Sequence, residues 1–273
     1  MSTGAHEPVV AALDDAWGAV LAVGGELDAT EWDMPSECPG WSVRDLVSHL
    51  IGIERTLLGE AAPPALERRP AHVRNELGDR NEAWVAPRRG LPGAAVLEEF
   101  RSVTGRRLAD LRSWPTARFD EPGPSPVGVV PYREFMAVRV MDSWVHEQDM
   151  RVATGRPGHT DGPAAELSLG RLSSALPFVV GKQAGAPEGA SVRFEVAGPL
   201  GRTLDVAVRG GRASVVEDLP GRPATILTMD TEVFWRLACG RITGPAARDA
   251  GLVGLQGDAG LGAAVVDAMA FMV

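Results

Sequence analysis

The chain has 273 residues, 45% of them hydrophobic, and a formal net charge of −9 at pH 7. This length favours about two domains, and the acidic balance argues against a nucleic-acid partner, whose phosphates call for clustered Lys and Arg. The first residues lack a secretion-signal pattern, no apolar run is long enough to span a membrane, and two cysteines are too few for a disulfide framework.

The first half of the chain predicts four long helices joined by irregular segments. Ser42 and Asp45 are spaced as in a capping box, and Leu46, Leu50 and His49 follow on one apolar face. A short helix is expected around 74–84, and the five prolines within 115–131 indicate a loop. The four long helices are expected at 9–23, 42–58, 94–114 and 131–153.

The second half predicts strands followed by helices, which is typical of a small α+β domain with an antiparallel sheet. We therefore expect an α + (α+β) chain: a helical bundle over 1–156 and the α+β domain over 157–273. Helices are expected at 163–180, 231–238 and 261–271, and strands at 192–196, 204–208, 213–216 and 224–227.

Two of the helical segments carry residues that bind metals. Asp142 and His146 are four apart on one helix, so their side chains are neighbours, and His49 lies on another helix. If the helices face each other, two imidazoles and one carboxylate converge, as a catalytic zinc site requires. Asp149 follows one turn after His146 and is a candidate to hold its imidazole or to contact substrate. The spacing also fits a core histidine bonded to a carbonyl and an intrahelical Asp–His ion pair.

Longer motifs around these residues resemble a known family. The stretch Cys38-Pro-Gly-Trp-Ser-Val-Arg-Asp-Leu-Val-Ser-His49-Leu, together with Val145-His146-x-x-Asp149 preceded by an acid at 142, resembles the mycothiol-dependent maleylpyruvate isomerase family, one of the DinB-like metal-binding bundles. Met229-Asp-Thr-Glu-Val-Phe-Trp-Arg-Leu-Ala-Cys-Gly-Arg and Gly257-Asp-Ala-Gly-Leu-Gly resemble the sterol-carrier-like domain usually fused to that bundle.

The resemblance implies a four-helix, DinB-like bundle with zinc as the metal, held by His49, Asp142 and His146, and mycothiol as the thiol cofactor. This chain departs from the family pattern at one ligand. Asp142 stands where Glu is expected, and Asp is one methylene shorter, which leaves the identity and affinity of the metal open.

Five other residues are further candidates for the site. Cys38 precedes a helix start, where a thiolate is activated, but the Pro-Gly-Trp after it favours a structural turn. Trp41 and Trp144 flank the two motifs and are candidates to wall a cofactor pocket, with core packing as the alternative. Arg236 and Arg241 are candidates to bind a substrate carboxylate, with an ordinary surface role as the alternative.

The main hypothesis is a cytoplasmic enzyme, monomeric or a small homo-oligomer, that uses a divalent metal and mycothiol on a small electrophilic substrate. It would be a cis–trans isomerase or a thiol S-transferase, with no nucleic-acid or membrane partner. A second hypothesis is a non-haem Fe(II) enzyme, since two His and one carboxylate also form that triad. A third is a non-catalytic, metal-stabilised protein that binds a small molecule.

Overall fold

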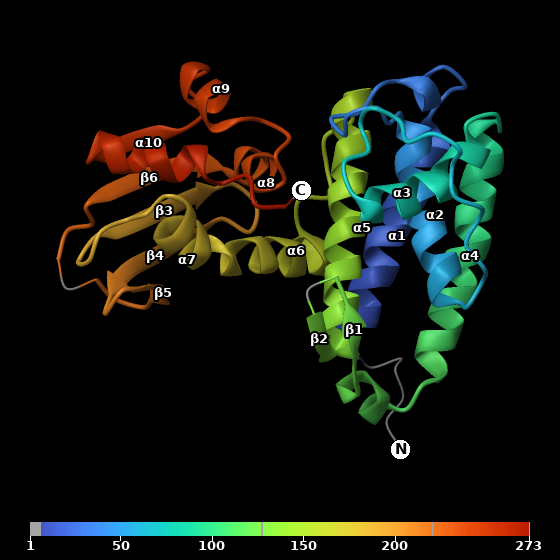
Figure 1. The fold of residues 1–273 in the computed structure, drawn as a ribbon, viewed down its shortest axis with the longest axis horizontal. Helices are drawn as coiled ribbons and strands as arrows, with labels where there is room; N and C mark the ends of the chain where they lie inside the picture. Colours follow the sequence, from blue (N-terminus) through green and yellow to red (C-terminus); the bar gives the residue numbers. More distant parts are fainter. Residues whose placement is uncertain (1–6, 127, 220, 273) are drawn as a thin grey trace. The chain divides into compact units, whose positions relative to one another are not determined.

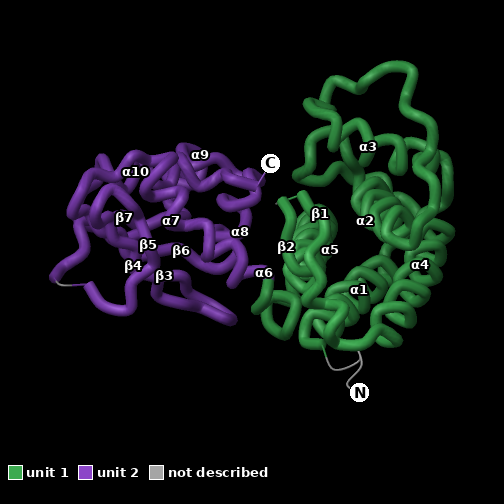
Figure 2. Tube along the Cα trace, turned by 60° about the horizontal axis from the view of Figure 1, so that its bottom comes forward, with its two compact units in different colours: residues 1–167 green, residues 168–273 purple. Residues whose placement is uncertain are grey.

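The computed structural model describes residues 7–126, 128–219 and 221–272 and divides into two compact units, 1–167 and 168–273 (Figures 1 and 2). The sequence predicts the domain boundary after residue 156. The division lies later, inside helix α6 (Gly162–Ser174), because the intervening residues are tied to the first unit. His159 Nε2 lies 3.2 Å from the Asp15 carboxylate, and the same carboxylate accepts a hydrogen bond from the backbone N–H of Ala164.

Five helices build the first unit, and four of them are long. Helix α1 packs against α4 and α5, and α2 packs against the same two helices, so the four surround a shared core (Figure 1). The short α3 lies against α2. The helices are α1 (Pro8–Glu26), α2 (Val43–Leu57), α3 (Glu76–Val85), α4 (Gly93–Ser113) and α5 (Tyr132–Thr154), with 3-10 turns at Glu31–Asp33, Ala86–Arg88 and Thr116–Asp120.

Helix α2 begins as its sequence predicts. The Ser42 side chain accepts from the backbone N–H of Asp45, and the Asp45 carboxylate accepts from the N–H of Ser42, which completes the capping box. Leu46 and Leu50 are fully buried, whereas Ile53 and Leu57, further along the helix, are only half-buried. The buried face instead continues through Glu54, a charged residue that the apolar pattern did not identify.

The segment 115–131, predicted as a loop, contains two short strands. Strands β1 (Pro122–Ser125) and β2 (Gly128–Pro131) pair in antiparallel register, with Pro122 opposite Pro131. Proline is tolerated here because each strand of a two-stranded ribbon has one edge that makes no ladder hydrogen bonds. The ribbon leads into α5, which ends at Gly155 in the left-handed conformation, φ 64°.

The second unit is a five-stranded sheet with helices packed on it (Figure 1). The strand order is β5-β4-β3-β6-β7. The prediction of an antiparallel sheet was wrong in one pair: β3 and β6 run parallel, because the connection from β5 returns the chain beside β3. All other neighbours are antiparallel. The strands are β3 (Ser191–Ala197), β4 (Arg202–Arg209), β5 (Arg212–Val216), β6 (Thr225–Asp230) and β7 (Gly254–Gly257).

The helices of this unit and one of its strands differ from the prediction. The expected helix 163–180 is broken at Ala175 into α6, a short α7 and a π-helical turn. Helix α9 and strand β7 were not predicted, and the last helix is shorter than expected. The elements are α7 (Leu176–Phe178), the π turn (Val179–Gln183), α8 (Thr231–Ala238), α9 (Gly244–Asp249) and α10 (Ala259–Asp267).

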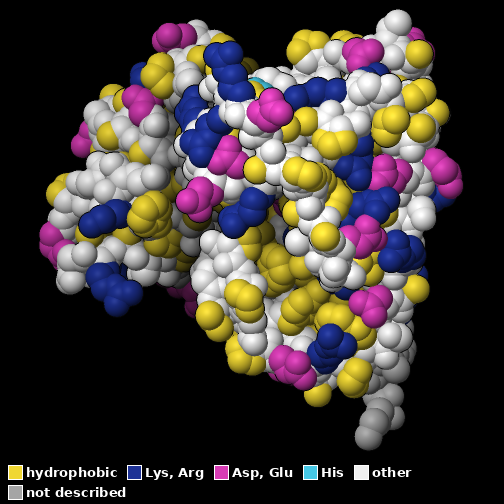
Figure 3. All heavy atoms as spheres, turned by 45° about the vertical axis from the view of Figure 1, so that its right-hand side comes forward, with side chains coloured by type: hydrophobic (Ala, Val, Ile, Leu, Met, Phe, Trp, Pro, Cys, Tyr) yellow, Lys and Arg dark blue, Asp and Glu magenta, His cyan; other side chains and the backbone are white. Residues whose placement is uncertain are grey.

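Helix α1 is the one helix among the described residues that is long and apolar enough to cross a membrane, judged by length and composition. Within the first unit, 56% of its most apolar window is buried, and core helices of soluble proteins pass the same test. Its apolar residues cover α4 and α5. On the face shown in Figure 3, acidic and basic side chains both occur among exposed hydrophobic ones.

The contact between α2 and α3 depends on a missing side chain at Gly52. A Cβ at this position would lie 2.4 Å from the Cβ of Trp84, so even alanine would overlap a buried ring. We expect Gly52→Ala to lower the free energy of unfolding by about 1–3 kcal/mol, although alanine favours helix. Gly105→Ala on α4, where nothing lies within 4 Å, should raise it by about 0.5–1 kcal/mol. Urea unfolding followed by circular dichroism checks both; equal stabilities would contradict the packing.

Candidate metal centre

Helices α2 and α5 bring the three predicted ligands together. His49 Nε2 lies 3.5 Å from Oδ2 of Asp142, and His146 Nε2 lies 3.7 Å from Oδ1 of the same carboxylate. The two imidazole rings meet edge to face, with centroids 5.0 Å apart. The donor atoms of all three residues lie within 4.8 Å of one another. The shorter Asp142 therefore reaches both histidines.

These distances suit a tetrahedral cation. For metal–ligand bonds of about 2.1 Å, neighbouring ligands of a tetrahedral site are roughly 3.4 Å apart, and each histidine Nε2 lies near that distance from one of the two Asp142 oxygens. Each imidazole also presents Nε2 to the shared carboxylate rather than its backbone-proximal nitrogen. His49 Nδ1 is buried and has no hydrogen-bond partner among the described residues, so this ring is not held as a satisfied core histidine. The residues present fit a divalent metal.

The protonation states of two ligands favour metal binding, because a ligand must be deprotonated. Burial lowers the pKa of His49, which keeps its imidazole neutral. Burial opposes the charged form of Asp142, but the Arg139 guanidinium and the two imidazoles overcome that and hold the pKa of Asp142 well below its usual range. The third ligand, His146, carries a proton that a metal must displace.

Asp149 lies where it can orient that third ligand. Its Oδ2 is 3.0 Å from Nδ1 of His146, leaving Nε2 toward the predicted ligands. Burial disfavours the imidazolium, yet the hydrogen bond to Asp149, with smaller contributions from Cys38 and Asp142, raises the pKa of His146 to about 10. Outer carboxylates of this kind fix the tautomer and the basicity of a metal-binding histidine.

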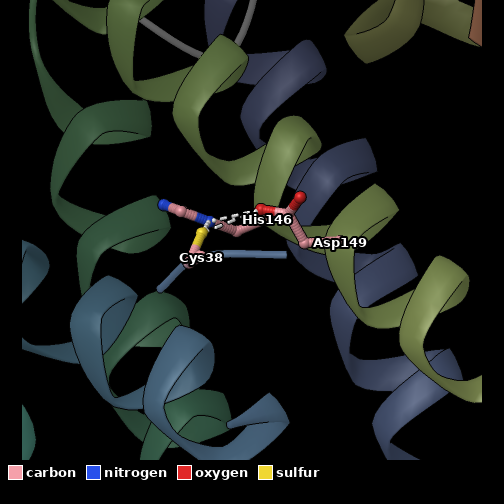
Figure 4. Close-up of side chains that lie close together, drawn as sticks. All are labelled: Cys38, His146 and Asp149. Atoms are coloured by element: carbon pink, nitrogen blue, oxygen red, sulfur yellow. Dashed lines mark hydrogen bonds and ion pairs between the residues drawn. The ribbon is translucent and has the colours of Figure 1, made fainter. Parts of the chain in front are cut away.

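Cys38 approaches the same nitrogen from the loop before α2 (Figure 4). Its Sγ donates to Asp149 Oδ2 at 3.4 Å and lies 3.9 Å from His146 Nδ1. A nucleophilic triad would place the thiol and the carboxylate on different nitrogens of the histidine. Here both meet Nδ1, so this arrangement is not a triad, although Cys38 does more than form a turn.

Sequence reasoning missed a buried ion-pair network behind Asp142. Arg139 Nη1 donates to Asp142 Oδ2 at 2.6 Å, and its Nε donates to Glu54 Oε1 at 2.9 Å. The Nε of Arg107, on α4, lies 3.3 Å from the second oxygen of Glu54. Two features of the sequence could have indicated this network: the i,i+3 spacing of Arg139 and Asp142, and a glutamate, Glu54, on the buried side of α2.

The two candidate tryptophans occupy different settings. Trp41 lies against both imidazoles, with ring centroids 5.1 Å from His49 and 6.2 Å from His146. Its indole N–H donates to the buried carboxylate of Glu82 at 3.0 Å, which fixes the ring. Trp144 is fully buried, and its indole donates to the backbone oxygen of His159 at 2.9 Å, a core position.

Arg236 and Arg241 belong to the second compact unit. Arg236, on α8, pairs with Glu232 at 3.2 Å, and Arg241 donates to the backbone oxygen of Cys239 at 2.9 Å. The role of both arginines toward a substrate carboxylate stays a prediction.

The Asp149–His146 hydrogen bond predicts a pH dependence of the metal-free protein. A histidine whose pKa rises from 6.5 to about 10 on folding adds stability that is present below pH 6.5 and lost as the pH approaches 10. Asp149→Asn should lower the pKa of His146 toward its ordinary value. The free energy of unfolding should then decrease less as the pH rises from 6.5 to about 10. NMR titration of the imidazole in chelator-treated protein checks this. The exposed Asp120→Asn is the control, and an unchanged pKa in Asp149→Asn would contradict it.

Comparisons with solved structures identify the fold. The crystal structure of a mutant of the mycothiol-dependent maleylpyruvate isomerase superposes with a TM-score of 0.57 at 19% sequence identity, covering 94% of this chain and 96% of that one. A second crystal structure of the same enzyme gives a TM-score of 0.54 at 19% identity, covering 89% of this chain and 93% of that one. Both share the mixed arrangement of helices and sheet.

Sequence comparisons identify the family. The uncharacterized protein Rv0738 of Mycobacterium tuberculosis (strain ATCC 25618 / H37Rv) is 28% identical over 169 residues, which are 60% of this chain and 74% of that protein. The model of the Mycothiol maleylpyruvate isomerase N-terminal domain matches residues 13–151, about half of the chain, and this segment contains His49, Asp142 and His146. The chain belongs to the mycothiol maleylpyruvate isomerase N-terminal domain family.

Proposed function

We propose that this protein is a metal-dependent enzyme that uses mycothiol to act on a small electrophilic substrate. The observation that carries the proposal is the convergence of two imidazoles and one carboxylate from α2 and α5 at distances suited to a tetrahedral ion. Family membership supports the thiol, since the enzyme in the related crystal structures is described as mycothiol-dependent.

In this proposal His49, Asp142 and His146 hold the metal, with zinc as the expected ion, and the four packed helices are a DinB-like bundle. A bound divalent metal lowers the pKa of a thiol that reaches it, which makes the thiol a nucleophile near neutral pH. Asp142 is the most exposed of the three ligands, with 26% of its side chain accessible, so the thiol would approach from its side.

The neighbouring residues have distinct tasks. Asp149 accepts a hydrogen bond from the Nδ1–H of His146. This holds the ring in the tautomer that leaves Nε2 free to bind the metal. Arg139 donates to Oδ2 of Asp142 and keeps that carboxylate charged and in place. Trp41, fixed by Glu82, covers the two imidazoles and keeps water from them. We propose its indole as one wall of the thiol pocket.

The reaction class is thiol addition to an electrophilic carbon. If the thiol leaves again after rotation about the activated bond, the product is a cis–trans isomer; if it stays, the product is a thioether. The family description favours isomerisation. We propose the second unit as a sterol-carrier-like domain, with Arg236 and Arg241 as candidates for a substrate carboxylate.

Metal binding at this site is tested by removing one proposed ligand at a time. We expect wild-type protein to retain about one equivalent of zinc, and His49→Ala or His146→Ala to weaken binding by at least about 100-fold, beyond the 10–100-fold that outer residues contribute. His159→Gln is a matched control, because His159 bonds to Asp15 and Glu147 instead. Elemental analysis of protein purified without added metal gives the answer. Retention of zinc by both alanine variants would contradict the proposed metal site, and iron in place of zinc would favour the hypothesis of a non-haem Fe(II) enzyme.

The thiol is tested by calorimetric titration of mycothiol into zinc-loaded protein. Wild type should bind, and His146→Ala, which loses the metal, should show no heat above dilution. Trp41→Ala should retain zinc and bind the thiol more weakly, because it removes a pocket wall and no ligand. Zinc-loaded wild type that gives no heat would reject the thiol cofactor. The same result would favour the hypothesis of a metal-stabilised protein that binds another small molecule.

A further inference from the structure

The two ring nitrogens of His146 face two different sets of donors. Nε2 faces Asp142 and His49, the set proposed above to hold the metal. Nδ1 faces the Cys38 thiol and the Asp149 carboxylate, from the loop before α2 and from the next turn of α5 (Figure 4). The donor atoms of this second group also lie within 4.8 Å of one another, and all three residues are buried.

We propose that Cys38, His146 and Asp149 form a second cation position that takes thiophilic divalent ions such as Cd²⁺ and Co²⁺. We call this the thiolate position and the set of His49, Asp142 and His146 the imidazole position. The proposal shares one residue with the proposed function but does not rest on it, because the thiolate position needs neither His49 nor Asp142.

The geometry of the thiolate position suits a cation. With metal–sulfur bonds of about 2.3 Å and metal–nitrogen or –oxygen bonds of about 2.1 Å, tetrahedral neighbours lie roughly 3.4–3.6 Å apart. Cys38 Sγ is 3.4 Å from Asp149 Oδ2 and 3.9 Å from His146 Nδ1. The nitrogen and the oxygen are 3.0 Å apart, so a cation requires them to separate by a few tenths of an ångström.

The donors differ in charge and softness from those of the imidazole position. A thiolate and a carboxylate together neutralise a dication, whereas the single carboxylate of the imidazole position, Asp142, is already paired with Arg139. Thiolate sulfur selects soft and borderline ions, while imidazole and carboxylate accept a wider range. A thiophilic ion is therefore expected to prefer the thiolate position.

His146 makes the two positions alternatives. A neutral imidazole has one nitrogen with a free lone pair and one that carries a proton. Binding at the thiolate position releases two protons to solvent, one from the Cys38 thiol and one from Nδ1 of His146, and leaves the second imidazole proton on Nε2. That nitrogen can then no longer bind at the imidazole position. The protein should hold one ion in all, and the softness of the ion should decide where it sits.

The test is the ultraviolet thiolate-to-metal charge-transfer absorption that appears when Co²⁺ or Cd²⁺ is added to metal-free protein. Wild type should show the band at a stoichiometry near one. Cys38→Ser should abolish it and weaken Cd²⁺ binding by at least about 100-fold, more than the loss of an outer-shell residue would. Cys239→Ser is the matched control, because Cys239 is the second buried cysteine and belongs to the other unit. His49→Ala should keep the band.

Two outcomes would overturn the thiolate position, and a third would overturn the competition between the two positions. Metal binding without a charge-transfer band would mean that Cys38 is not a ligand. A band that disappears in His49→Ala would mean one mixed site, with Cys38 as a ligand of the imidazole position. A stoichiometry of two would remove the competition for His146. Circular dichroism confirms that each variant is folded. The zinc content of Cys38→Ser tests the imidazole position independently, because this variant lacks the thiolate, so either position can fail without the other.

Discussion

A buried ion pair between Glu54 on α2 and Arg139 on α5 sets how these two helices meet. Arg139 Nε donates to Glu54 at 2.9 Å, and both residues are almost fully buried. Taking two charges out of water is costly, and such a pair adds little net stability over well-packed apolar residues. Removing one partner, however, leaves the other charge buried without compensation and lowers the free energy of unfolding by about 3–5 kcal/mol. The pair therefore penalises any other register of α2 on α5, and the register decides whether His49 faces Asp142.

The same network positions each of the proposed metal ligands. Arg139 continues from Glu54 to Asp142 and keeps that carboxylate charged in a buried setting. Asp149 fixes the tautomer of His146, and Glu82 fixes the indole that covers both rings. The exception is His49, whose Nδ1 lacks a hydrogen bond among the described residues. Because the other groups are already held, a cation needs to order little more than this one ring, which favours tight and specific binding.

The sequence predicted the helices of the first unit and the residues on them because both depend on local rules. The capping box at Ser42 and the left-handed Gly155 fixed helix ends, and the i,i+4 spacing made Asp142 and His146 neighbours. No local rule places one helix against another, so spacing alone could not separate a metal site from core histidines. Long-range partners were missed for the same reason: Arg139 with Glu54, and Cys38 with Asp149, are more than 80 residues apart. The parallel pairing of β3 with β6 likewise depends on where a returning strand lies.

Helix α5 shows why its pattern is difficult to interpret from sequence. Arg139, Asp142, His146 and Asp149 recur every three or four residues, as on the solvated face of a surface helix. Yet three of these four are buried, and the fourth is half-buried. A charged stripe can turn inward only if other segments supply a partner for each member, because an unpaired buried charge is too costly. The partners here are Glu54 and His49 on α2 and Cys38 on the preceding loop. A core built for stability alone would use apolar residues at these positions, so the retained charges support the metal centre proposed above.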